Sequence, residues 1–180
     1  MENGRIALRP FYAHSLLCFI KDRQMTPSPF LQPVYFDSCA FDGGDSNEQA
    51  ASIETRGLLE KNGGRINVLH SVQKEIDYPA TPQWVKDLAG TYIQTLQVPL
   101  TPQEKKELGD VEHIIAGKGS LEKRKADCRH VFEAQKYGRY FVTTDKEILK
   151  HSDAIRKRFT ILYIVKPSEL LEVVKHYNET

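Results

Sequence analysis

The stretch RYFVTTDKEIL, residues 139–149, is the most informative part of the sequence about the architecture. Residues 140–142 are apolar and predict a buried strand, after which the chain becomes polar and reaches Asp145. The earlier stretch PVYFDSCAF, residues 33–41, repeats this pattern, because its apolar run ends directly on Asp37. An Asp at the end of a strand is also an ordinary helix cap, so either acid taken alone has two interpretations.

Apolar runs alternate with helical segments along the rest of the chain. The runs predict strands at 34–37, 65–70, 139–143 and 159–165. Helix caps and stops predict helices at 47–61, after Ser71, after Thr81–Pro82, after Thr101–Pro102, at 120–137, from about 145 and from Pro167. This order predicts an α/β fold in which helices cover both faces of a central parallel sheet, an α/β/α sandwich. In such sheets the ligand site lies outside the carboxyl ends of the strands.

Length and composition narrow the class of protein. A chain of 180 residues with a formal net charge of +1 is long enough for one well-packed domain and has no global attraction for nucleic acid. The three cysteines show no paired spacing, so we expect no disulfide framework or structural zinc and a reducing, cytoplasmic setting. The apolar run HSLLCFI is short and followed by charges, so we expect neither a signal peptide nor a membrane span.

Four acids fall where they can share one edge of the sheet. Asp37 and Asp145 end strands, Glu75 borders the side of its helix that faces the sheet, and Asp127 lies on an apolar helix stripe. A cap or a solvated position is the ordinary explanation of each acid, although an inward-facing Asp127 needs a partner. Clustered carboxylates repel one another unless a cation neutralises them. The set therefore predicts an Mg²⁺ or Mn²⁺ site suited to phosphoryl chemistry.

The chain resembles the PIN-domain ribonucleases over roughly residues 33–165. The stretches that carry the resemblance are VYFDS, VLHSVQKEI, ADCRHVFEAQKYG and RYFVTTDKEIL. Each stretch is short, and the ordered set of Asp, Glu, Asp and Asp is more specific than any member.

The resemblance implies an endoribonuclease that cuts single-stranded RNA. Asp37, Glu75, Asp127 and Asp145 would bind Mg²⁺ or Mn²⁺, and Thr143 would help to orient the site or its water. Metal-activated water would then attack the phosphodiester. The resemblance also includes toxins of the VapC type, which pair with an antitoxin protein, and many members form homodimers.

The domain organisation departs from that of a compact toxin. Residues 31–180 would form a single PIN-like domain with a helical insertion around 79–118. Residues 1–30 would be an N-terminal extension, either an extra helix or residues upstream of a start at Met25.

Basic residues surround Asp127 on the helix at 120–137. Lys123, Arg124, Lys125 and Arg129 are candidates for RNA phosphate contacts, although a run of charges is more often a solvated helix face. The six histidines show no zinc-like spacing, and we interpret His70, His113 and His130 as polar surface or rim residues.

Two other functions compete with the nuclease. A catalytically silent PIN-like module would bind RNA or a protein partner without cleaving, but it has no need of an acidic cluster. A phosphatase of the haloacid dehalogenase type would need a second acid two residues after Asp37, where the sequence has Cys39.

Overall fold

The central sheet has five parallel strands. In this computed structural model residues 26–42, 45–117 and 119–179 are described, so residues 1–25 of the expected N-terminal extension lie outside the described part. The strand order is β3-β2-β1-β4-β5. The strands are β1 (Pro33–Phe36), β2 (Arg65–Val68), β3 (Ile93–Gln94), β4 (Tyr140–Val142) and β5 (Tyr163–Val165). The α/β fold predicted from the sequence is confirmed.

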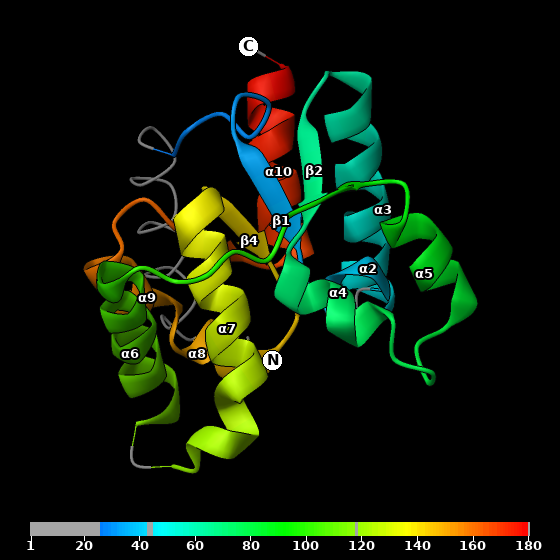
Figure 1. The fold of residues 1–180 in the computed structure, drawn as a ribbon. Coiled ribbons are helices and arrows are strands. Elements are labelled where there is room, and N and C mark those ends of the chain that lie inside the picture. The colour runs from blue at the N-terminus through cyan, green and yellow to red at the C-terminus, as the bar shows by residue number, and fades with distance from the viewer. Residues whose placement is uncertain (1–25, 43–44, 118, 180) are drawn as a thin grey trace, which may run out of the picture.

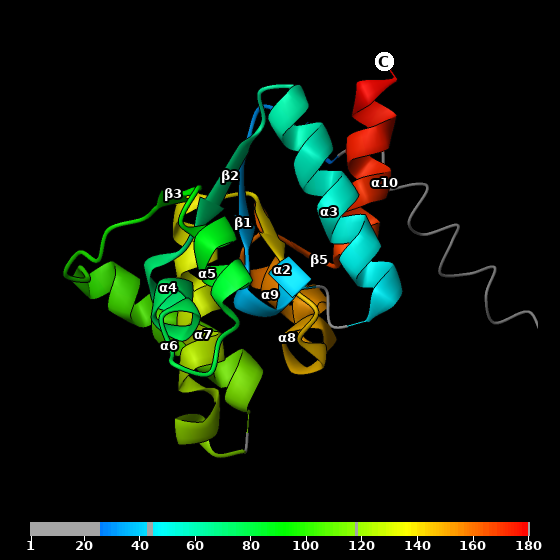
Figure 2. The same cartoon turned by 90° about the vertical axis from the view of Figure 1, so that its right-hand side faces the viewer.

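Helices cover both faces of the sheet (Figures 1 and 2). On one face α3 (Ser46–Lys61) packs against α10 (Pro167–Asn178), and on the other α6 (Pro102–Ala116) packs against α7 (Leu121–Tyr137). Shorter helices connect these layers: α2 (Ser38–Asp42), α4 (His70–Ile76), α5 (Gln83–Ala89), α8 (Lys146–Lys150) and α9 (Ser152–Arg158). Because both faces are covered, the interior strand β4 is buried along its whole length.

Local sequence signals determine several helix ends. Thr101 and Glu104 form the predicted capping box at the start of α6. Gly138 ends α7 and lets the chain pass close to β1, since a Cβ on Gly138 would clash with the ring of Tyr35. Among the described residues no helix is both long and apolar enough to cross a membrane.

Some predicted local features are wrong. Ser71 lies inside α4 and does not cap it, and the Thr81 hydroxyl donates to the carbonyl oxygen of Glu75 and does not cap α5. The first half of the predicted strand 159–165 is a turn, because Phe159 ends α9 and packs into the core. The strand β3 falls within the expected helical insertion and was not predicted.

The strand order places a topological switch point at the carboxyl edge between β1 and β4. From β1 the chain continues toward α3 on one face, whereas from β4 it continues through α8 to α9, which contacts α6 on the other face. The two connections diverge, and ligand sites of open α/β sheets form at such a point. The backbone keeps the two strand ends together, because the Asp37 amide donates to the Val142 carbonyl at 2.9 Å.

Candidate metal centre

Asp37 is the buried acid at this switch point. Its side chain follows the last residue of β1 and is 3% exposed. Oδ1 accepts the Ser38 amide at 2.8 Å, and Oδ2 accepts the Thr143 hydroxyl at 2.6 Å and the Cys39 thiol at 3.4 Å. Neutral donors therefore hold the carboxylate in one orientation without compensating its charge, so the charge needs a cation.

Glu75 and His130 bring the second acid and an imidazole to Asp37. Glu75 lies on α4, and its Oε1 is 2.9 Å from Nε2 of the buried His130 on α7. The other oxygen of Glu75 accepts the Ser38 hydroxyl at 2.8 Å. Nδ1 of His130 is 2.9 Å from the Ser71 hydroxyl, so both ring nitrogens have partners.

The charges of this cluster shift the pKa of each member. Burial raises the pKa of Asp37, the nearby Glu75 raises it further, and His130 and Thr143 act in the opposite direction. The hydrogen bond from His130 lowers the pKa of Glu75. Burial alone would lower the pKa of His130, but the hydrogen bond to Glu75 and the charges of Asp37, Glu75 and Asp127 together raise it. The raised pKa of His130 favours its protonated form, whose charge would compensate part of the negative charge of the two carboxylates.

Asp127 and Asp145 form a second, outer pair of acids. Oδ1 of Asp145 caps α8 by accepting two backbone amides at 2.7 and 3.0 Å, so the cap interpretation is confirmed for this residue. Asp127 interacts with Arg124, which is 3.5 Å away and also pairs with Glu147. Burial and the charge of Asp145 raise the pKa of Asp127, and the charge of His130 lowers it. Two of the four predicted acids, Asp37 and Glu75, thus share the inner cluster with His130, whereas Asp127 and Asp145 are not part of it.

A single metal ion fits the inner cluster. Asp37, Glu75 and His130 each offer a ligand atom, and these atoms lie within 4.8 Å of one another. Ligand atoms on one ion lie at most about 4.4 Å apart when the bonds are about 2.2 Å. A shift of less than about half an ångström would therefore close the site around an ion. This buried Asp–Glu–His cluster can hold a metal.

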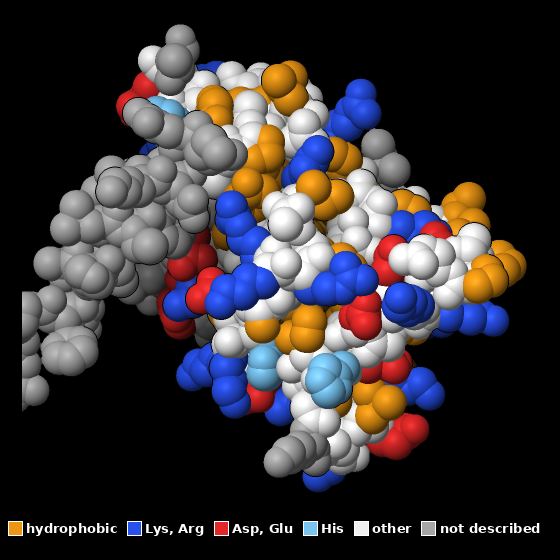
Figure 3. Space-filling model, turned by 90° about the vertical axis from the view of Figure 1, so that its left-hand side faces the viewer, with side chains coloured by type: hydrophobic (Ala, Val, Ile, Leu, Met, Phe, Trp, Pro, Cys, Tyr) orange, Lys and Arg blue, Asp and Glu red, His pale blue; other side chains and the backbone are white. Residues whose placement is uncertain are grey.

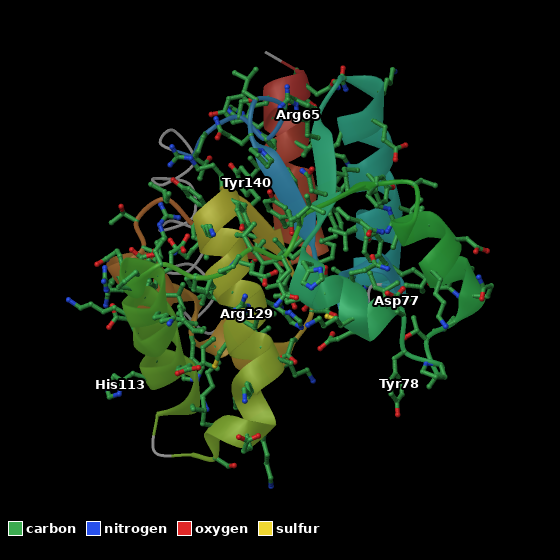
Figure 4. All side chains as sticks on the ribbon, in the orientation of Figure 1. Arg65, Asp77, Tyr78, His113, Arg129 and Tyr140 are labelled. Atoms are coloured by element: carbon green, nitrogen blue, oxygen red, sulfur yellow. The ribbon has the colours of Figure 1, made fainter. Side chains whose placement is uncertain are left out.

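Two hollows flank α7 beside the centre. The larger, about 790 Å³, lies between α4 and α7 and includes Glu75 and His130 in its lining. The smaller, about 350 Å³, lies between the start of α7 and the end of α8. Figure 4 shows Arg129 on α7 and Tyr78 projecting from the loop after α4; both residues line the larger hollow.

The four candidate phosphate contacts divide between these hollows. Lys123 and Arg124 line the smaller one, and Lys125 and Arg129 line the larger one. Arg129 is held at 2.8 Å from Glu133. On the side of the molecule that carries α6 and α9, Figure 3 shows Lys and Arg side chains spread among acidic and apolar ones, as the small net charge suggests. A polyanion would thus depend on local contacts.

The histidine interpretation needs one correction. His113 is exposed and His70 lies at the rim of the larger hollow, as predicted, but His130 is buried at the centre. A signal was present, because Asp127 and His130 are three residues apart and therefore share one side of α7. The apolar residues Val131 and Phe132 follow His130 directly, so the sequence around His130 resembles an ordinary core segment.

Comparison with known proteins adds no assignment. No protein-family model matches the chain, and no curated protein matches it. The function must be argued from the site itself.

Proposed function

We propose that the protein is a metal-dependent endoribonuclease that hydrolyses phosphodiester bonds of single-stranded RNA. The observation that carries this proposal is the place of Asp37, Glu75 and His130. They meet at the carboxyl edge where the connections from β1 and β4 diverge, beside an open hollow. A bound Mg²⁺ or Mn²⁺ would supply an acidified water and charge neutralisation at the phosphate.

The residues of the site would have different roles in the reaction. Asp37, Glu75 and His130 would hold the ion, and the outer acids Asp127 and Asp145 would orient the attacking water and accept its proton. Thr143 supports both pairs, because its hydroxyl donates to Asp37 and accepts the Asp145 amide at 3.0 Å. This double role agrees with the orienting function that the family resemblance implies for Thr143.

RNA phosphates would contact the lysines beside the centre more than the arginines. Arg124 is held by Asp127 and Glu147, and Arg129 by Glu133, so a phosphate would have to compete with these carboxylates. Lys123 and Lys125 are exposed and line different hollows beside α7. An RNA strand that passes over α7 could contact both.

A serine nucleophile is the strongest competing chemistry. Ser71, His130 and Glu75 form a hydrogen-bonded series that resembles a nucleophile, a base and an orienting acid. Acyl transfer also needs amides that stabilise an oxyanion. The Ser71 amide donates to Glu133 at 2.9 Å and the preceding His70 amide donates to Thr95 at 2.8 Å. Because the amides of Ser71 and His70 are occupied, we favour the metal-dependent reaction.

Cleavage of a labelled single-stranded RNA pool tests the proposal. The parent protein should cleave with Mn²⁺ or Mg²⁺ and stop in EDTA, and Asp37→Asn should lose at least about a thousandfold in rate. Asp87→Asn is the matched control, since Asp87 is an exposed acid on α5 that accepts a hydrogen bond from the side-chain amide of Gln83 in its own helix. Equal cleavage by parent and Asp37→Asn would reject the proposal. A parent that binds RNA without cleaving it would instead support the silent module.

A further inference from the structure

The imidazole in the cluster bears on which ion the centre binds. Glu75 Oε1 and His130 Nε2 are 2.9 Å apart. Two neighbouring ligands at right angles on one ion, with bonds of about 2.1 Å, lie about 3.0 Å apart. The two atoms therefore already have the separation of neighbouring ligands, and an ion could replace the proton that they now share.

The far side of the His130 ring is fixed by a chain of polar contacts. Nδ1 is 2.9 Å from the Ser71 hydroxyl, and the Ser71 amide donates to Glu133 Oε2 at 2.9 Å. Glu133 is nearly buried, and its other oxygen accepts Nε–H of Arg129 at 2.8 Å. Histidines that bind metals ordinarily have such a partner on the second nitrogen, which orients the ring and selects its tautomer.

The same series of contacts holds Arg129, which the sequence predicts as a phosphate contact. Its guanidinium also lies over the Phe132 ring, 5.6 Å from the centroid. A side chain fixed by an ion pair and an aromatic ring is poorly placed to follow an RNA backbone. Arg129 instead compensates the charge of Glu133, which in turn holds Ser71.

We propose that this centre is a mixed nitrogen–oxygen site that binds Mn²⁺ or a related first-row transition ion in preference to Mg²⁺, with Ser71 as the positioning residue for the imidazole. The proposal rests on the metal centre of the proposed function and specifies the class of ion. Two carboxylates alone suit Mg²⁺ as well as Mn²⁺, whereas imidazole is a ligand for transition ions and a poor one for Mg²⁺. His130 is therefore the ligand that would make the centre prefer Mn²⁺ over Mg²⁺.

The first test detects nitrogen at the metal directly. Pulsed electron paramagnetic resonance of Mn²⁺ bound to the full chain should show ¹⁴N modulation from the His130 ring. His130→Gln offers an amide oxygen in place of the ring nitrogen, so the modulation should disappear. His113→Gln, which changes an exposed histidine on α6, should leave it unchanged.

The second test compares affinities for the two ions by calorimetry, without RNA. His130→Gln should lower the ratio of Mn²⁺ to Mg²⁺ affinity about tenfold, the factor of one lost interaction of about 1.4 kcal/mol. A structural histidine would change both affinities together. Ser71→Ala should weaken Mn²⁺ about ten- to a hundredfold with the nitrogen signal retained, and Ser71→Thr should restore most of the affinity.

The outcomes separate this inference from the nuclease proposal. Mn²⁺ bound without ¹⁴N modulation, or a parent without preference for Mn²⁺ over Mg²⁺, would overturn the inference and leave a metal-dependent nuclease possible. A nitrogen signal with no RNA cleavage would support the inference and reject the nuclease. A parent that binds neither ion would overturn both. The parent spectrum decides whether a nitrogen binds the metal even if a variant fails to fold.

Discussion

Acidic residues on the two sides of α7 have different positively charged partners. Toward α4, Glu75 pairs with the imidazole of His130, and toward α8, Asp127 pairs with the guanidinium of Arg124. A protonated imidazole can give up its proton and become a metal ligand, whereas a guanidinium keeps its charge and cannot bind a metal. The inner pairing can therefore be exchanged for an ion, and the outer one cannot.

The difference indicates that an acidic cluster should be assessed by its existing partners. The four acids look equivalent in sequence, but Asp145 uses one oxygen to cap α8 and Asp127 already has a cation. Among the described residues, the donors to the Asp37 oxygens are neutral, and the imidazole of His130 lies nearby. We therefore expect the metal to bind at Asp37 and Glu75, with the outer pair modulating the site.

The largest expected effect is the loss of metal stabilisation in Asp37→Asn. Thermal unfolding in EDTA and then with Mn²⁺ should show the parent stabilised by about 2.7 kcal/mol at a hundredfold excess over its dissociation constant. The variant should gain little. In EDTA it should be as stable as the parent or more so, because burial raises the pKa of the Asp37 carboxyl and disfavours its charge. Equal Mn²⁺ responses, or a variant that is simply less stable, would make Asp37 a structural residue.

The next largest expected effect is on stability, and it distinguishes the capping hydrogen bonds of Asp145 from its negative charge. Asp145→Ala removes the acceptor for two amides of α8 and should cost about 1 kcal/mol of unfolding free energy in EDTA. Asp145→Asn keeps an acceptor and should stay within about 0.5 kcal/mol of the parent. Both variants should retain the Mn²⁺ response. If Asp145→Asn loses that response, the ion binds nearer the outer pair and the proposed contrast fails.

The sequence was sufficient for most of the fold because capping and periodicity are local. The apolar run before Asp37 and the capping box of Thr101 predicted β1 and the start of α6. The apolar run 159–165 was less informative. Phe159 packs into the core from the end of α9 and does not begin a strand. β3 is too short, at two residues, to give a pattern.

The site was only partly predictable because its partners come from distant elements. The two strand-end acids follow from the rule for parallel sheets, and Glu75 and Asp127 from their helix faces. The contact of His130 with Glu75 joins residues 55 apart in sequence, and its contact with Ser71 joins residues 59 apart. The spacing within one helix cannot reveal such pairs, which depend on how α4 and α7 pack.

The smallest expected effect concerns the basic residues on the outer side of α7. Lys123→Gln should leave stability unchanged, since the side chain is exposed, but should weaken binding of a single-stranded RNA in EDTA. The slope of log affinity against log salt should fall by about 0.7, the contribution of one phosphate contact on a single strand. Lys157→Gln, an exposed lysine on α9, is the matched control. If both variants change the slope equally, RNA binding by the basic residues is diffuse, and the small hollow beside Arg124 has no special part in it.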